Sequence, residues 1–441
     1  MKIAPLALAA LTLTCTCTCA GANAAALSPT EQAIVAQARA NAPQALQLLE
    51  RSVNINSGTM NLDGVRAVGR LYRYELEQLG FATRWIDMPP AMGRAGHLIA
   101  TRDGNQGSGA KGKRLLLRGH LDTVFEPGSQ VPLWQRDGDR VRGQGVNDMK
   151  GGDVVIIEAL RALQRAGALD GAAITVLLTG DEEDAGEPIA VSRADMVAAA
   201  RRSDIALAFE GTVRNQEGRD TGTIGRRSSS SWELEVKGKQ GHSSGIFSEN
   251  AGYGAVYETA RILDGFRQQV IEPDLTFSAG MMVGGTDVAV APGGIEGTAS
   301  GKTNVIAKSA SVRGDLRYLS FEQRDRAHAK MRAIVAQNLP GTSASIVFHD
   351  AYPPMSPTAG NVALLKVYSQ ASSDAGLGEI PALPPGQRGA GDIQFIAPML
   401  DSLDGLGVAG NGAHSPDEDL EIASVERATI RTALLIYRLT R

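Results

Sequence analysis

The chain contains little cysteine: of its 441 residues only Cys15, Cys17 and Cys19 are cysteines, and all three lie within the first 26 residues. If this segment is removed, no disulfide can form, and at this length the hydrophobic core must stabilise the fold by itself. Beyond the start, no apolar run approaches the ~20 residues that a membrane-spanning helix needs. The net charge of -4 gives no electrostatic reason to expect a nucleic acid or an anionic membrane as a partner.

Residues 1–26 have the pattern of a secretory signal peptide. Lys2 precedes an apolar run, and small residues follow, ending in the cleavage pattern Ala22-Asn23-Ala24. A buried N-terminal helix is a weaker alternative because Thr and Cys alternate there, and none of the cysteines has the preceding residues of a lipoprotein site. We therefore expect the protein to be exported, to the periplasm or outside the cell.

The rest of the chain predicts an α/β fold with two domains. Helical patterns cover most of residues 27–80, and apolar strand-like runs then alternate with helices up to residue 223. Such near-continuous apolar strands indicate a buried and mainly parallel sheet. The same pattern returns after residue 353, so we predict one domain formed by two segments, residues 27–223 and 354–441.

Residues 224–353 have a different pattern. A Ser-rich strand is followed by a helix, two strands, a helix and a strand. This β-α-β-β-α-β order is typical of a ferredoxin-like unit. We therefore predict a smaller α+β domain that is inserted into the first one.

Histidine is scarce as well, with six in the whole chain, and two of them occur together with acidic residues at the places where an α/β sheet binds ligands. The short segments "GHLDTV", "DEED" and "FEG" each follow an apolar strand, whereas "GVNDMKGG" and "GAHSPDE" are Gly-rich turns close to helices. The candidate residues in these segments are His120, Asp122, Asp148, Glu182, Glu183, Glu210 and His414.

Histidine and carboxylate ligands without cysteine indicate a hydrolytic site for zinc, with cobalt or manganese as alternatives. Two histidines are too few for two separate zinc sites, so one carboxylate must bridge them, and Asp148 is our candidate. Each residue also has an ordinary structural interpretation: Asp148 could cap a helix, and Glu182 with Glu183 could form a solvated loop. Glu210 is harder to explain in this way, because it ends an apolar strand and a buried charge needs a partner.

The motifs "GHLDTV", "GVNDMKGG", "TGDEEDAGEP", "FEG", "GKQGHSSG" and "GAHSPDE", in this order, resemble those of the M20 family of metallopeptidases, and most of all its glutamate-carboxypeptidase branch. The resemblance covers nearly the whole chain after residue 26. It implies a zinc-exopeptidase-like catalytic domain interrupted by a ferredoxin-like lid domain, through which two copies form a homodimer.

The same resemblance implies two Zn2+ ions per chain. One is bound by His120 and Glu210, the other by His414 and Glu183, and Asp148 bridges them.

Three further features follow from the resemblance. Asp122 holds the imidazole of His120, Glu182 is the general base, and the peptide bond between Asp148 and Met149 is cis. The adjacent glutamates can divide the work, because neighbouring side chains of an extended segment point in opposite directions.

The resemblance also assigns residues of the inserted domain. His242, in "GKQGHSSG", would reach across the dimer into the neighbouring active site and support the oxyanion. Arg317 and Asn304 would bind the substrate carboxylate, the arginine through a two-pronged contact. The alternatives are a surface histidine for His242 and an ordinary strand salt bridge for Arg317.

We therefore predict a di-zinc exopeptidase that removes a C-terminal amino acid, with glutamate as a candidate, from a small peptide or an N-acyl amino acid. Where relatives often have Gly-Ser after the double glutamate, this chain has "DAGEP", which leaves the substrate less defined than the chemistry. A deacylase or a dipeptidase of the same family is an alternative. A periplasmic binding protein with an inactive site is a weaker one, because all the ligand positions and the base are filled.

Overall fold

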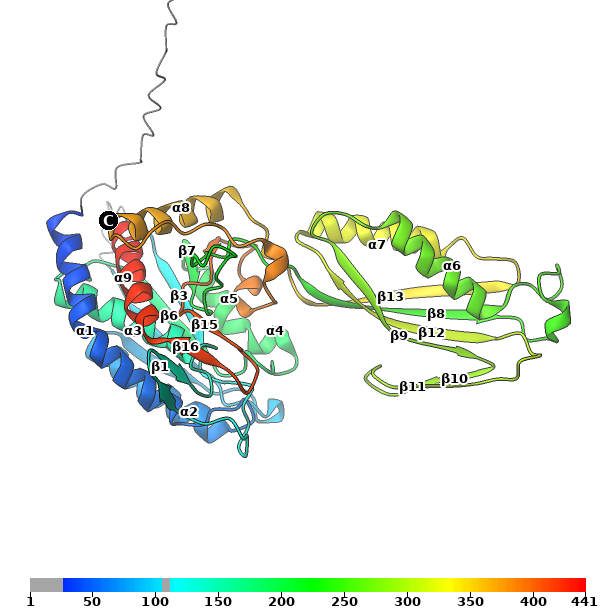
Figure 1. Cartoon of the computed structure of the whole chain (residues 1–441), viewed down its shortest axis with the longest axis horizontal. Coiled ribbons are helices and arrows are strands. Elements are labelled where there is room, and N and C mark those ends of the chain that lie inside the picture. Colours follow the sequence, from blue (N-terminus) through cyan, green and yellow to red (C-terminus); the bar gives the residue numbers. More distant parts are fainter. Residues whose placement is uncertain (1–26, 105–111) are drawn as a thin grey trace, which may run out of the picture.

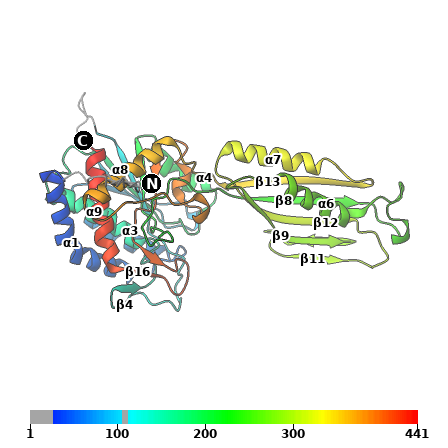
Figure 2. The same cartoon turned by 45° about the horizontal axis from the view of Figure 1, so that its top comes forward.

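The computed structural model describes residues 27–104 and 112–441, so the predicted signal peptide lies outside the described residues. The chain forms a rounded domain from which a second, elongated domain extends like an arm (Figure 1), and a view turned by 45° shows the same arrangement (Figure 2). Within the described ranges, no helix combines the length and hydrophobicity that crossing a membrane requires.

The rounded domain is built on a six-stranded sheet in which three of the five strand pairs are parallel. The strand order is β1 (Ala82–Ile86), β2 (His97–Arg102), β6 (Ile174–Thr179), β3 (Leu115–His120), β7 (Ile205–Ala208) and β14 (Asp401–Leu403). Strand β2 runs antiparallel to both of its neighbours, and the other contacts are parallel. The predicted mainly parallel sheet is confirmed, and the carboxyl ends of β3, β6 and β7 meet at one edge.

Helices surround this sheet. They are α1 (Pro29–Val53), α2 (Leu62–Gln78), α3 (Lys150–Arg165), α4 (Ile189–Ser192), α5 (Ala194–Ala200), α8 (Ala359–Asp374) and α9 (Ile422–Leu439). Short 3-10 helices occur at η1 (Pro90–Met92), η3 (Pro385–Gln387) and η4 (Asp392–Phe395). Helix α1 starts where Ser28 and Glu31 form a reciprocal capping box, which satisfies free N–H groups of its first turn.

Both faces of the sheet are buried, because its strands are apolar on both sides. Leu115 and Leu117 of β3 belong to the larger core, which contains residues of α1, α3 and α9. Leu116 points the other way and packs in a second core with Met196 and Ala199 of α5. Burial on both faces fixes the register of β3 and therefore the position of the residues at its end.

A small sheet joins two distant parts of the chain next to the edge where the strands end. Its order is β15 (Gly410–Asn411), β16 (Asp419–Glu421), β5 (Arg140–Arg142) and β4 (Gln135–Asp137). Asp419 of β16 pairs with Arg142 of β5. The loop between β15 and β16 is thereby held beside the turn that precedes α3.

The elongated domain has the β-α-β-β-α-β order that the sequence indicates, with one additional hairpin. Its elements are β8 (Ser229–Gly238), the 3-10 helix η2 (Ser243–Gly245), α6 (Gly254–Gln269), β9 (Thr276–Gly285), β10 (Asp287–Val290), β11 (Gly297–Ser300), β12 (Ser309–Arg317), α7 (Phe321–Val335) and β13 (Thr342–Tyr352). The antiparallel sheet has the order β13-β8-β12-β9, and β10 pairs with β11 separately. Alternate residues of β8, namely Trp232, Leu234 and Val236, pack into a core with residues of α6 and α7.

Candidate metal centre

Three of the predicted ligands meet at the carboxyl ends of β3 and β7. His120 is the last residue of β3, Glu210 lies two residues beyond β7, and Asp148 lies two residues before α3. Nε2 of His120 is 3.2 Å from Oδ1 of Asp148 and 3.8 Å from Oε1 of Glu210. The three side chains offer donor atoms within 4.8 Å of one another, a spacing that one metal ion can bridge.

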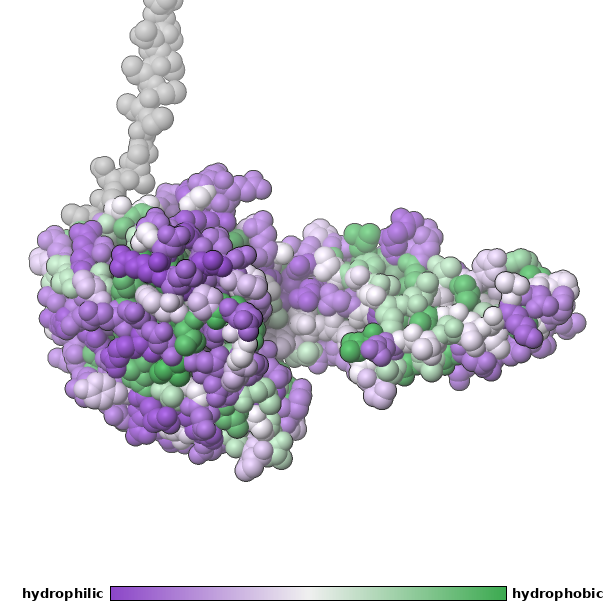
Figure 3. All heavy atoms as spheres, turned by 60° about the horizontal axis from the view of Figure 1, so that its bottom comes forward, coloured by the Kyte–Doolittle hydropathy of each residue, from purple (hydrophilic) through white to green (hydrophobic). Residues whose placement is uncertain are grey.

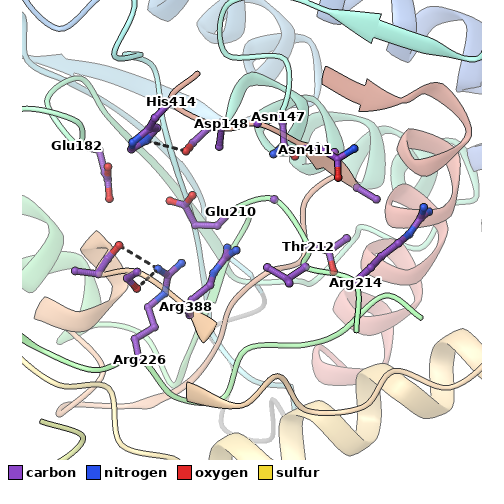
Figure 4. A pocket seen from close by; sticks show the side chains of 18 of the residues that line it. Asn147, Asp148, Glu182, Glu210, Thr212, Arg214, Arg226, Arg388, Asn411 and His414 are labelled. Atoms are coloured by element: carbon purple, nitrogen blue, oxygen red, sulfur yellow. Dashed lines mark hydrogen bonds and ion pairs between the residues drawn. The ribbon is translucent and has the colours of Figure 1, made fainter. Parts of the chain in front are cut away.

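A second group shares Asp148 with the first. His414 lies in the loop between β15 and β16, and its Nε2 is 3.1 Å from Oδ2 of Asp148 and 2.9 Å from Oε2 of Glu183. Asp148 therefore faces one histidine with each of its two oxygens, and Figure 4 shows the contact with His414. This geometry suits the bridging position that we predicted for Asp148.

The donor set fits a pair of divalent cations. Imidazole and carboxylate groups are ordinary zinc ligands, and Oε1 of Glu183 is buried without a hydrogen-bond partner among the described residues. Contacts with Asp148 and Glu183 raise the pKa of His414 to about 11, which shows that this cage favours a positive charge. A metal ion bound here would take the place of that proton.

Asp122 orients His120 from behind. It is fully buried, and Nδ1 of His120 lies 3.0 Å from the Asp122 carbonyl oxygen and 3.5 Å from its carboxylate. The hydroxyl of Thr59 donates to the same carboxylate at 2.7 Å, and the backbone N–H groups of Glu182 and Glu183 donate at 3.1 Å each. Asp122 thus ties the imidazole to the loop that carries both glutamates.

The adjacent glutamates point to different places, as we expected. Glu183 contacts His414, whereas the carboxylate of Glu182 faces the pocket (Figure 4) and its Oε1 accepts the backbone N–H of Asp392 at 3.3 Å. Burial, followed by the charge of Asp392, raises the pKa of Glu182 well above its usual value, while bound cations would act in the opposite direction. A carboxyl group whose affinity for a proton is raised in this way is suited to accept a proton and return it.

Glu418 holds the loop that carries Asp148, and our sequence analysis assigned it no role. It is fully buried, and its carboxylate accepts the backbone N–H groups of Gly145 at 3.2 Å, Asn147 at 2.8 Å and Asp148 at 2.9 Å. The peptide bond from Asp148 to Met149 is cis, as the resemblance implied. Glu418 lies inside the motif "GAHSPDE", but nothing in an acidic run marks which carboxylate is buried.

A buried network of ion pairs lies behind the site. Arg118 pairs with Asp392 and lies 3.3 Å from Glu210. Arg193 continues the network, at 2.8 Å from Asp392 and 2.6 Å from Asp181. Asp181 of the acidic run is therefore a buried support rather than a solvated charge. The sequence offered one signal for this network: Arg118 lies inside the apolar run "LLLRGH", and a charge in a buried strand needs a partner.

Three predicted residues of the elongated domain lie outside the pocket of their own chain. His242 and Asn304 are neighbours beyond the end of β8, where the backbone N–H of Ser243 donates to the Asn304 carbonyl at 2.9 Å. Arg317 ends β12 and forms an ion pair with Asp315 at 3.0 Å. The structure therefore brings together the five predicted ligands, Asp122 and Glu182, but it does not bring these three residues to them.

A pocket of about 460 Å³ opens beside the ligands. It is lined by Asp148, Glu182, Glu210 and His414, and it continues along a polar wall that includes four arginines: Arg140, Arg214, Arg226 and Arg388. Its volume suits an amino acid derivative or a short peptide.

Two candidate cation sites that share one carboxylate, with a further glutamate at the pocket beside them, are typical of metal-dependent hydrolases. Comparison with protein families identifies the group: residues 116–438 match peptidase family M20/M25/M40, and the chain belongs to this family. It is therefore an enzyme of the metallopeptidase and amidohydrolase class.

Relatives with known names are similar over most of their length. The chain is 27% identical over 413 residues to carboxypeptidase G2 from Pseudomonas sp. (strain RS-16), which covers 90% of this chain and 89% of the relative. It is 28% identical over 361 residues to succinyl-diaminopimelate desuccinylase from Acidiphilium cryptum, which covers 79% and 87% of the two chains.

Solved structures share the fold. Aminopeptidase PepT from Bacillus cereus superposes with a TM-score of 0.69 at 16% identity, covering 91% of this chain and 99% of that one. The YXEP protein of Bacillus subtilis, described as a dinuclear metal binding peptidase of the M20 family, has a TM-score of 0.62 at 16% identity, covering 91% and 99%. At these identities the likeness supports the two-domain architecture and not a substrate.

Proposed function

We propose that the protein is a di-zinc exopeptidase that hydrolyses the amide bond of a C-terminal amino acid, with glutamate as a candidate, in small peptides or N-acyl amino acids. The observation that carries this proposal is the position of Asp148, which faces a histidine with each oxygen while Glu182 faces the adjoining pocket. The similarity to carboxypeptidase G2 supports the choice of a carboxypeptidase.

The residues would divide the reaction as follows. Two zinc ions would be held around the shared Asp148 by His120, Glu210, Glu183 and His414, and cobalt or manganese could take their place. Bound there, the ions would polarise the scissile carbonyl as Lewis acids and lower the pKa of a bound water.

Glu182 accepts the proton of the attacking water and returns it to the leaving amine. Asp122 keeps the His120 ring in the tautomer whose Nε2 is free to bind a metal.

We also propose that the elongated domain forms a homodimer and that His242 acts in the active site of the partner. Within one chain His242 follows β8, which runs along the elongated domain (Figure 1), and it does not line the pocket. Among the described residues, eight of the fourteen exposed large apolar side chains fall in residues 224–353, including Val256 and Tyr257 of α6 and Met282 of the edge strand β9. Figure 3 shows apolar residues gathered along this domain. Such a surface is typical of a protein interface.

A test of the shared site uses two inactive variants. Glu182→Gln and His242→Ala would be purified separately, dissociated and mixed. Partial recovery of activity is expected, because a mixed dimer contains one site with both native residues. No recovery, in a mixture shown to contain mixed dimers, would mean that His242 does not act in the active site of the partner. Arg317 and Asn304 would bind the substrate carboxylate when the inserted domain closes, and alanine at either position should raise KM.

The reaction itself is tested with a panel of dipeptides and N-acyl amino acids, each with a free or blocked terminus, assayed with two zinc ions per chain and again with a chelator. A carboxypeptidase requires the free C-terminal carboxylate and tolerates a blocked amine, whereas a dipeptidase requires the free amine. A deacylase is the second candidate because of the desuccinylase relatives, and it would prefer short acyl groups. Failure to cleave any member of the panel would disprove the proposed function.

Export is the remaining part of the proposal. It rests on the sequence pattern of residues 1–26. Mass spectrometry of the protein from its native host should find a mature N-terminus near Ala24, in the periplasm or the medium.

A further inference from the structure

One arginine of the active-site pocket differs from the others in its surroundings. Three of the four pocket arginines are paired with a carboxylate of the protein: Arg140 with Asp419, Arg214 with Asp220, and Arg226 with Asp404. Arg388 has no such ion pair within residues 27–104 and 112–441, and its Nε is buried without a hydrogen-bond partner there. A partly buried guanidinium without a carboxylate partner lowers the stability of the fold unless a bound ligand supplies the opposite charge.

The loop that carries Arg388 is held in place. Arg226 donates from Nη1 to the carbonyl oxygens of Gly389 at 2.7 Å and Ala390 at 3.1 Å. Arg226 is itself fixed, because its Nε donates to the buried Asp404 at 2.7 Å. The two residues after Arg388 are thus held by hydrogen bonds, so the backbone of this loop loses little conformational entropy when a ligand binds.

The position of Arg388 points to the charge of its ligand. Figure 4 shows its side chain directed into the pocket beside Glu210, on the side of the pocket where Thr212 lies. The carboxylates that act on Arg388 are Asp404, which is already paired with Arg226, and then Glu210 and Asp148, which both belong to the candidate metal centre. When cations are held there, these carboxylates are compensated, and the guanidinium faces the pocket as an unmatched positive charge.

We propose that Arg388 determines specificity by binding a carboxylate of the substrate, so that the enzyme selects amides that carry an additional carboxylate close to the scissile bond. A guanidinium and a carboxylate match through two parallel hydrogen bonds. This role rests on the proposed amide hydrolysis, and it is separate from that of Arg317, which lies on the inserted domain and is paired with Asp315.

The test compares N-benzoyl-L-glutamate with its α-amide and its γ-amide, using protein loaded with zinc. For the wild type, replacing the contacted carboxylate by the amide should lower kcat/KM. Arg388→Ala should lower kcat/KM about 10- to 100-fold for the diacid, the loss expected for one charge-assisted contact, and should change it little for the amide that lacks the contacted carboxylate. The γ-amide is the one expected to lose the dependence on Arg388, because the α-carboxylate is the C-terminal one proposed for Arg317 and Asn304; a dependence lost on the α-amide instead would overturn the assignment. Arg388→Lys should recover part of the loss, because lysine restores the positive charge but not the two parallel N–H groups of the guanidinium.

Arg214→Ala is the matched control, because it removes a positive charge from the same pocket wall at an arginine already paired with Asp220. Its discrimination between acid and amide should stay close to that of the wild type. An equal loss in Arg214→Ala and Arg388→Ala, or an Arg388→Ala variant that loses the same factor on all three substrates, would overturn the assignment.

A binding measurement separates this inference from the proposed function. Glutarate has two carboxylates and no amide to hydrolyse, and calorimetry should show it binding at least about 10-fold more weakly to Arg388→Ala than to the wild type. If no amide is cleaved but glutarate binding depends on Arg388, the proposed reaction fails and the carboxylate site stands. If amides are cleaved and neither readout responds to the variant, only the role of Arg388 fails.

Discussion

Replacing Glu418 by alanine is expected to weaken metal binding although Glu418 is not a metal ligand. Its buried carboxylate accepts three backbone N–H groups, at 2.8, 2.9 and 3.2 Å. Each buried donor left without an acceptor costs about 1–3 kcal/mol, so the variant should lose roughly 3 kcal/mol of unfolding free energy even if water enters and restores part of the bonding. Glu418→Gln keeps one acceptor oxygen and should lose less.

The same variant should affect both cation sites, because the loop that Glu418 holds carries the shared Asp148. We expect the zinc dissociation constants to rise about 10- to 100-fold, as for other residues that support metal ligands. Competition with a chromophoric chelator measures these constants, and urea unfolding measures stability. Asp417→Ala is the matched control, since the neighbouring Asp417 side chain is 86% exposed and pairs with Arg142 at the surface. Unchanged zinc affinity in Glu418→Ala would refute the positioning role.

Three further predictions concern charge. Burial raises the pKa of Glu158 in α3 to about 7 from 4.5, although Arg161 lies 3.1 Å away. Protonation of Glu158 therefore favours the folded state. The stability that this proton contributes is complete below pH 4.5 and is lost as the pH rises through 7. Glu158→Gln should raise the free energy of urea unfolding by up to about 3 kcal/mol at pH 8 and should not change it at pH 4. Arg118→Met leaves Asp392 buried without this partner and should cost about 3–5 kcal/mol in the same assay, whereas a loss below 1 kcal/mol would contradict the network. Because the pKa of His414 is about 11 without metal, zinc binding at pH 8 should release a proton. The enthalpy of zinc binding measured by calorimetry should then vary with the ionisation enthalpy of the buffer. A binding enthalpy that is the same in all buffers would contradict this.

The sequence was sufficient to predict the sheet and the residues that gather at its edge, because both depend on local patterns. The apolar run that forms β3 ends at His120, and the parallel register of β3 with β6 places His120 opposite Thr179, just before the acidic run. Glu210 follows the next apolar strand, β7. Ligands of this kind can be located once each strand end is located, since parallel strands end at the same edge.

The supporting residues were missed because their partners lie far away in the chain. Glu418 accepts the backbone N–H of Asp148, which lies 270 residues earlier in the sequence, and the inserted domain lies between Arg118 and its partner Asp392. The hairpin of β10 and β11 was missed for another reason: its segments, "DVAV" and "GTAS", are only four residues long. Arg388 was missed because its lack of an ion pair among the described residues can be seen only in the folded chain, where the other pocket arginines are paired.

The most direct test of the account is the Glu182→Gln variant, assayed together with its metal content. The variant keeps all five proposed metal ligands, so we expect it to retain two zinc ions per chain, as measured by mass spectrometry. The loss of the proton-accepting carboxylate should lower kcat about 100- to 10,000-fold on a substrate that the wild type cleaves. A variant that contains both metal ions and turns over at the wild-type rate would contradict the assignment of Glu182 as the general base.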